Sequence, residues 1–208
     1  MSRATSSGLA RPLAGILILA FASALAGCGV NNIPTYEESA KAAWAEVQNQ
    51  YKRRADLIGN LVETVKGFAE QEKSVLTQVT EARSKATGVQ IPPDVLTNPD
   101  ALKKFQDAQS SLGAALRQLM VVVERYPDIK SGANFAQLQS QLEGTENRIA
   151  IARRDYIEAV RLFNTELNTF PGRLWKAALY PDKKEMASFE ATPEETEAPK
   201  VDFGTDKK

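Results

Sequence analysis

Hydrophobic positions recur along most of this chain by alternating steps of three and four residues, which is the period of an amphipathic α-helix. The first series begins after Thr35, which together with Glu38 has the pattern of a helix-capping box. The series continues without a slip through Ala40, Trp44, Val47, Tyr51, Arg54, Ile58, Leu61, Val65, Phe68, Glu72, Val75, Val79, Ala82 and Ala86. We therefore expect one unbroken helix that ends at Gly88.

Two further helical series follow a proline-rich loop. The first begins at Asn98 or Asp100 and ends at Pro127, and the second begins at Asn134 and ends at Pro171. No segment shows the strict alternation that is typical of a half-buried strand. The sequence therefore predicts an all-α fold: an antiparallel bundle of three long helices, the first extended, plus a short C-terminal helical segment.

Unequal helix lengths leave part of the first helix without a neighbour. Short connections make consecutive helices antiparallel neighbours, so the second helix covers the first only back to about residue 55. A stripe that contains Trp44, Val47 and Tyr51 is left over. Because an apolar stripe of this length is unfavourable in water, we predict these three residues to be an interaction surface.

Three arrangements of the first helix are consistent with this stripe. The helix breaks within 53–59 and folds back as a fourth bundle member, or it stays straight and packs against a second copy, or it lies close to a bilayer. Gly59 weakens the helix by about 1 kcal/mol relative to alanine, which permits a bend without requiring one. We favour a straight or gently bent helix.

The N-terminus has the pattern of a bacterial lipoprotein signal peptide. Arg3 and Arg11 precede an apolar run that ends in Leu25-Ala26-Gly27-Cys28. The run is shorter than the roughly 20 apolar residues that a spanning helix needs. We predict Cys28 to be the lipid-attachment residue, and the resemblance to such signals implies a diacylglyceryl thioether there. An uncleaved membrane anchor and an ordinary leader with an incidental cysteine are the alternatives.

These features divide the chain into four parts. We expect a signal peptide over 1–27, a tether over 28–34, the helical bundle over 35–190 and a disordered acidic tail over 191–208, because that tail is nearly free of large apolar residues. Residues 173 to 180 within the bundle can form two more helical turns.

Composition excludes several functions. The chain has 26 basic and 26 acidic residues, so it lacks the basic excess of a nucleic-acid-binding protein. Cys28 is the only cysteine, and there is no histidine, which is the commonest general base and metal ligand. We therefore predict no catalytic residue, no cofactor and no metal site, and we expect a protein that is not an enzyme.

Four charged residues carry alternatives. Arg54 and Glu72 occupy seam positions, where they either form buried polar contacts that set helix register or extend to solvent. Glu143 and Glu146 lie three residues apart, so they either bind a cation or belong to a charged helix face with pairs of the kind Arg154–Glu158.

Several motifs together resemble the LemA family of bacterial envelope proteins. They are KRRADLIGNLVETVKGF over 52–68, EAR over 81–83, ERYPD over 124–128, TENRIAIAR over 145–153 and FP at 170–171. Gly59 stands where the family usually has proline, and Ile157 stands where it commonly has asparagine. The resemblance implies a helical bundle that its N-terminus holds at a membrane, on the extracytoplasmic side, and it supplies no reaction.

Two functions are compatible with these observations. The first is a lipid-anchored interaction or scaffold protein that binds itself or another envelope protein, in the cell membrane or, given Gly29 after the cysteine, the outer membrane. The second is an envelope carrier or sensor that binds a small amphiphile between helices. An apolar pocket lined by Ala82, Ala86, Ala152 and Ala159 would favour the carrier, whereas a solid core would favour the scaffold.

Overall fold

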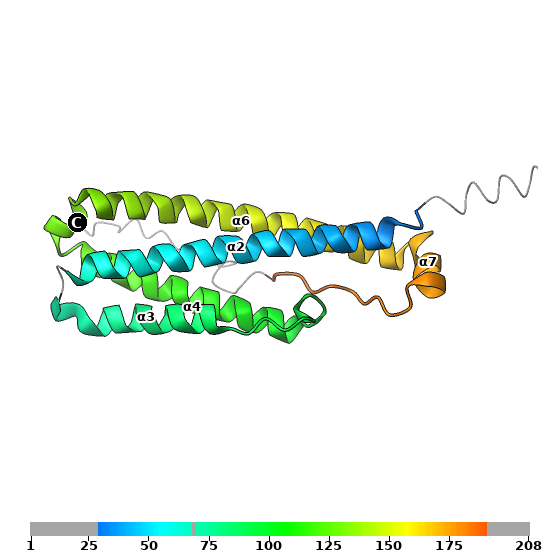
Figure 1. Ribbon diagram of the computed structural model, residues 1–208, viewed down its shortest axis with the longest axis horizontal. Helices are drawn as coiled ribbons and strands as arrows, with labels where there is room; N and C mark the ends of the chain where they lie inside the picture. Colours follow the sequence, from blue (N-terminus) through cyan, green and yellow to red (C-terminus); the bar gives the residue numbers. More distant parts are fainter. Residues whose placement is uncertain (1–28, 68–69, 191–208) are drawn as a thin grey trace, which may run out of the picture.

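The computed structural model describes residues 29–67 and 70–190, and over these residues the chain is helical without any strand (Figure 1). This confirms the predicted all-α class. The predicted signal peptide, Cys28 and the acidic tail lie outside the described residues. The elements are α2 (Asn32–Lys66), η1 (Glu70–Glu72), α3 (Lys73–Gly88), η2 (Val95–Thr97), α4 (Pro99–Val123), α5 (Pro127–Lys130), α6 (Ala133–Asn168) and α7 (Gly172–Leu179).

The first predicted helix is broken, so the prediction of one helix up to Gly88 is wrong. α2 stops at Lys66 with Gly67 at its C-cap, and α3 folds back antiparallel to it (Figure 1). Glycine is the poorest helix former after proline, and the reversal lets α3 bury Leu76 and Val79 in the bundle. The break is also not within 53–59, since Gly59 lies inside α2.

The other helix boundaries agree more closely with the sequence pattern. Asn98 caps α4 as predicted, because its side-chain oxygen accepts a hydrogen bond from the Ala101 N–H at 3.1 Å. α2 instead begins at Asn32, three residues before Thr35, and fully buries Ile33. The last three residues of the predicted tether are therefore helical, and Thr35 is not a cap. α7 forms the two expected turns.

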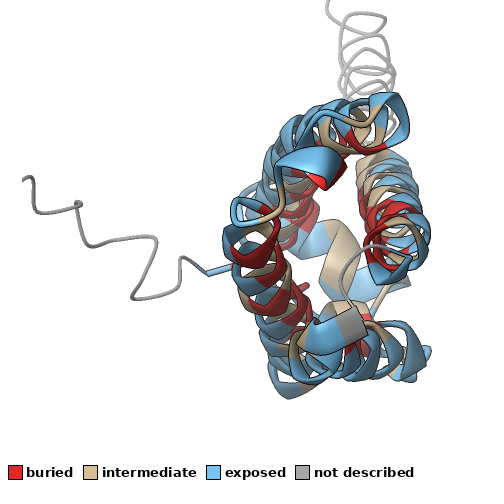
Figure 2. Ribbon diagram, turned by 90° about the vertical axis from the view of Figure 1, so that its left-hand side faces the viewer, coloured by how far each residue is buried: buried red, intermediate tan, exposed pale blue. Residues whose placement is uncertain are grey.

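The bundle has two parts along its length. α2 and α6 pack antiparallel over almost their whole extent, and at about 1.5 Å per residue each is roughly 50 Å long. α3 lies beside only the C-terminal part of α2, whereas the start of α4 reaches back to Trp44 (Figure 1). Figure 2, which looks along the bundle, shows the buried residues on the helix faces that are turned inward. The core accordingly consists of two clusters of buried side chains.

An extended segment over residues 180–190, here called the strap, covers the part of α2 that α3 leaves free (Figure 1). The Phe189 ring of the strap lies 6.0 Å from the Trp44 ring and 5.4 Å from the Tyr156 ring, measured between centroids. Phe105 of α4 lies 5.3 Å from Trp44. These aromatic contacts close the core around the N-terminal half of α2.

The strap corrects the prediction of an uncovered stripe. Trp44, Val47 and Tyr51 are only 5%, 1% and 6% exposed. The sequence argument considered helices as the only cover, whereas an extended segment more than 130 residues further along the chain does part of this work. The three residues are therefore core residues of the described fold and present no exposed apolar stripe to a second copy or to a bilayer.

Backbone hydrogen bonds hold the strap in place. The Asn164 side chain accepts from the Met186 N–H and donates to the Met186 carbonyl, both at 2.8 Å. The Tyr156 hydroxyl donates to the Ala187 carbonyl at 2.7 Å, and burial raises the pKa of this phenol so that it keeps its proton. The strap thus satisfies its polar backbone groups through side chains of α6.

Candidate functional site

Arg54 of α2 forms the most buried charged contact among the described residues. Its side chain is only 7% exposed, although the residue is charged and lies on the apolar seam. One terminal nitrogen donates to the Gln109 side chain at 2.7 Å and to the Gln109 carbonyl at 3.0 Å. The other donates to a Glu146 carboxylate oxygen at 3.2 Å. Arg54 therefore joins α2 to α4 and α6, which confirms the hypothesis that it makes buried polar contacts between helices.

One donor of this guanidinium has no partner. The Nε atom of Arg54 is buried, and no acceptor among the described residues reaches it. The guanidinium carbon also lies 5.0 Å from the centre of the Tyr51 ring, a cation–π arrangement. A buried donor without an acceptor is costly, so this guanidinium stabilises the fold less than one whose N–H groups are all paired.

Arg54 forms part of the floor of a groove of about 760 Å³ between α4 and α6. Side chains from Gln106 to Arg117 line one wall, and side chains from Glu146 to Arg153 line the other. Three of the lining residues are arginines, Arg54, Arg117 and Arg153, and one is an acid, Glu146. The groove therefore has a net positive charge and favours acidic groups.

Small side chains explain why α4 and α6 leave this groove open. The α4 wall contains Ser110, Ser111, Gly113 and Ala114, none of which can bury much apolar surface against a facing helix. Leu112 and Leu119 of α4 are fully buried in the cluster shared with α2 and α3, and Leu116 is the one large apolar residue of α4 that lines the groove. Sequence analysis predicted the buried seam but did not predict that Arg117 and Arg153 line a groove. The small residues on one face of α4 are the local feature that could have indicated it.

A second polar contact involves Glu72, the other charged seam residue. The Tyr126 hydroxyl donates to a Glu72 carboxylate oxygen at 3.2 Å, and the Arg125 guanidinium lies 3.1 Å from the same oxygen. The ERYPD motif thus holds the turn between α2 and α3. Arg54 and Glu72 do not pair with each other: Arg54 has partners on α4 and α6, and Glu72 has partners in the turn between α4 and α5.

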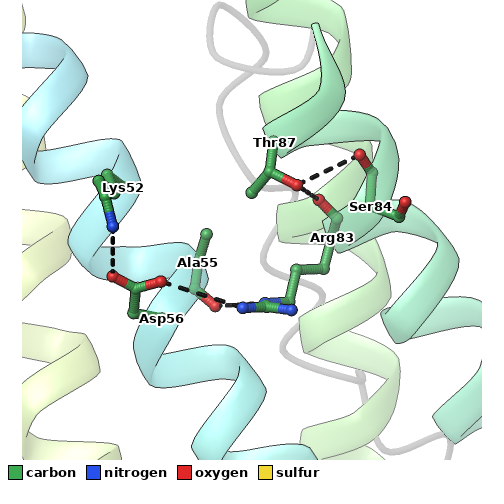
Figure 3. A network of polar contacts seen from close by, with 6 residues as sticks. All are labelled: Lys52, Ala55, Asp56, Arg83, Ser84 and Thr87. Carbon is green, nitrogen blue, oxygen red and sulfur yellow. Dashed lines mark hydrogen bonds and ion pairs between the residues drawn. The ribbon is translucent and has the colours of Figure 1, made fainter.

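A third contact ties α3 to α2 beside Gly59 (Figure 3). The Arg83 side chain of α3 donates from Nε to the Ala55 carbonyl at 2.7 Å and lies 3.9 Å from the Asp56 carboxylate. A Cβ placed on Gly59 would come within 3.2 Å of the Arg83 guanidinium. The EAR motif therefore serves helix packing here.

The acidic pair on α6 forms part of a charged helix face. Glu143 accepts from Gln139 of its own helix at 3.1 Å, and Glu146 contacts Arg54. Arg154 pairs with Asp155 instead of Glu158, which pairs with Arg161. Within the described ranges no group of three or more acidic or sulfur ligands is close enough to hold a metal ion.

The predicted site residues have different outcomes. Cys28 lies outside the described residues. Trp44 and Val47 belong to the core, whereas Tyr51 is buried but also lines the groove. In the described part of the chain, every helix is too short or too polar to cross a membrane.

Comparison with known proteins agrees with the motifs described above. The model of the LemA family matches residues 43–203. Magnetosome protein MamQ 2 of Paramagnetospirillum magneticum is 27% identical over 157 residues, which cover 68% of this chain and 58% of that protein. Protein LemA of Metamycoplasma hominis is 27% identical over 124 residues, which cover 60% of this chain and 52% of that protein. The chain thus spans somewhat more than half of the length of these relatives, and it belongs to the LemA family.

Proposed function

We propose that this protein is a lipid-anchored, non-enzymatic interaction or scaffold protein of the bacterial cell envelope. Acylated Cys28 would attach it to the cell membrane or the outer membrane, with the bundle on the extracytoplasmic side. The signal-peptide pattern supports the anchor, since a lipid thioether with a further acyl chain gives stable attachment. Membership of the LemA family is compatible with this role.

The groove between α4 and α6 is the binding surface in this proposal. The observation that carries it is an open groove whose lining includes three arginines, Arg54, Arg117 and Arg153, and one acid, Glu146. A carboxylate can bind a guanidinium through charge-assisted hydrogen bonds, and Arg117 and Arg153 add positive charge along the walls. The proposed occupant is an acidic segment of an envelope protein, either a different protein or a second copy of this one.

The arrangement of the alanines gives less support to a carrier of small amphiphiles. Ala82 and Ala86 pack with the cluster shared by α2, α3 and α4. Ala152 and Ala159 pack with the other cluster, beside Tyr156 and the strap. The four alanines therefore do not line one cavity, which was the arrangement expected of a carrier.

Photocrosslinking in living cells tests the groove. A photoreactive residue at Ser111, which is exposed on the groove wall, should give an adduct with a partner protein. Arg117→Glu should abolish that adduct because it reverses a charge inside the groove. Lys103→Glu is the matched control, since it reverses a charge on the same helix outside the groove and should leave the adduct intact.

The result that contradicts the groove is an adduct at Ser111 that Arg117→Glu leaves unchanged. Trp44 and Tyr51 are less suitable crosslinking positions, because both are buried and a photoreactive group there would react with the core.

A further inference from the structure

Three large apolar side chains are exposed close together in the sequence, at one end of the bundle. Phe170 is 81% exposed, Leu174 is 56% exposed and Leu179 is 55% exposed. All three belong to the turn between α6 and α7 or to α7 itself, and we call them the apical corner. The other exposed large apolar residues are Val121 of α4 and, on α6, Ile151, Ile157 and Leu162, all outside this turn and α7.

The apical corner is fixed to the first described residues of the chain (Figure 1). The Tyr180 hydroxyl donates to the Val30 carbonyl at 3.3 Å, and Asn32 donates to the Glu166 carboxylate at 3.3 Å. A Cβ at Gly29 would lie 3.6 Å from Pro171. Since consecutive Cα atoms are about 3.8 Å apart, anything that holds position 28 at a surface brings the apical corner to that surface.

Close packing holds the corner in one orientation. Gly172, the first residue of α7, lies so close to the Glu166 carbonyl oxygen that an added Cβ would overlap it. Trp175 turns inward and packs on the core, which leaves Leu174 and Leu179 facing out. Arg173 is exposed beside them, as is common in helices that lie in a membrane interface.

From this arrangement we propose that the apical corner contacts the lipid bilayer and inserts Phe170, Leu174 and Leu179 among its headgroups. This inference rests on the proposed anchoring at Cys28. Three side chains give weak binding by themselves, so the lipid supplies the affinity and the corner supplies the orientation. At about 1.5 Å per residue, the distance along α2 from Asn32 to Arg54 then holds the groove roughly 30 Å from the membrane.

Single-cysteine labelling of the full chain tests the orientation. Cys28 is the only native cysteine, and acylation blocks its thiol, so a cysteine introduced elsewhere takes up a fluorescent label alone. The lipidated protein carries the label at Phe170→Cys or Leu174→Cys, with Val121→Cys and Ile151→Cys as exposed controls. Each is reconstituted into vesicles of phosphatidylethanolamine and phosphatidylglycerol, with and without brominated acyl chains that quench nearby fluorophores.

The proposal predicts that the labels at 170 and 174 lose most of their fluorescence in brominated vesicles, whereas those at 121 and 151 keep theirs. If the protein floats with the vesicles and the labels at all four positions fluoresce equally, the proposed contact between the apical corner and the bilayer is wrong. The proposed anchoring at Cys28 would then still stand. If the unaltered chain takes up label at Cys28, or does not float with the vesicles, the proposed anchoring is wrong. The proposed contact of the apical corner, which depends on that anchoring, is then wrong as well.

Discussion

Charged side chains make the most specific contacts between the elements of this protein. Arg54 joins α2 to α4 and α6, Glu72 contacts the turn after α4, and Arg83 joins α3 to α2. A shift of α2 along its neighbours is penalised, because it leaves the buried Arg54 charge without partners. These contacts therefore fix how the helices align, while the large apolar residues supply most of the burial.

Substitutions of Arg54 and of Glu146 should lower the free energy of unfolding by different amounts, even though the two side chains contact each other. Arg54→Met leaves the buried Gln109 side chain without its donor, and we expect it to lower the free energy of unfolding by about 1–3 kcal/mol. The Glu146 side chain is 47% exposed and can bind water, so Glu146→Gln should cost less than about 1 kcal/mol. Urea denaturation of both variants measures the difference, and equal losses would contradict the asymmetry.

Among the elements, a helix start that depends on neighbouring residues could be predicted from the sequence. The segment that covers α2 from far along the chain could not. The start of α4 could be predicted because an asparagine before a proline is a local capping signal. The break after Lys66 could not, because the seam keeps its period of threes and fours on both sides of it. The strap has no helical period, and its partners Tyr156 and Asn164 lie more than 20 residues away in the sequence.

Asn164 should control the stability of the strap. Asn164→Ala removes both hydrogen bonds to the Met186 backbone, so the Met186 amide should exchange with solvent roughly tenfold faster. Asn147→Ala, on an exposed position of the same helix, is the matched control and should change nothing. Hydrogen exchange followed by mass spectrometry reports both. A strap that exchanges at the same rate in all three proteins would show that the Asn164 hydrogen bonds do not hold it.

The strap also gives the fold a dependence on pH. Burial opposes ionisation of Glu37, but the hydrogen bonds and attraction of Lys183 and Lys41 outweigh it, so the pKa of the Glu37 carboxyl lies below its usual 4.5. A carboxyl with a lowered pKa stabilises the fold above its unfolded pKa, and this stabilisation disappears as the pH falls through the folded pKa.

Glu37→Gln should therefore lower the urea midpoint at about pH 7, and this difference should shrink as the pH falls through the folded-state pKa and the native carboxyl takes up its proton. Glu38→Gln is the control, since Glu38 is a largely exposed neighbour on the same helix and makes no contact with the strap. A Glu37→Gln effect that persists undiminished as the pH falls would mean that the ion pair is not its cause.

The described part of the molecule is an elongated bundle whose first residues and apical corner share one end (Figure 1). The groove lies further along, between α4 and α6. Sequence analysis predicted Arg54 as a polar seam residue, because its position in the period is visible. It did not predict the groove, which depends on α4 turning its small residues toward α6. The proposed function requires the two features together: attachment at one end and a basic groove held away from the membrane.

Attachment through Cys28 is the most direct test of this account. The full chain and its Cys28→Ser variant are expressed in a bacterial host, separated into membrane and soluble fractions and weighed by mass spectrometry. The account predicts that the native protein is in the membrane fraction and that its mass shows a lost leader and added acyl chains. The variant should carry no acyl mass, and its processed form should be absent from the membrane fraction. A variant in the membrane fraction with the same processed mass as the native protein would contradict it.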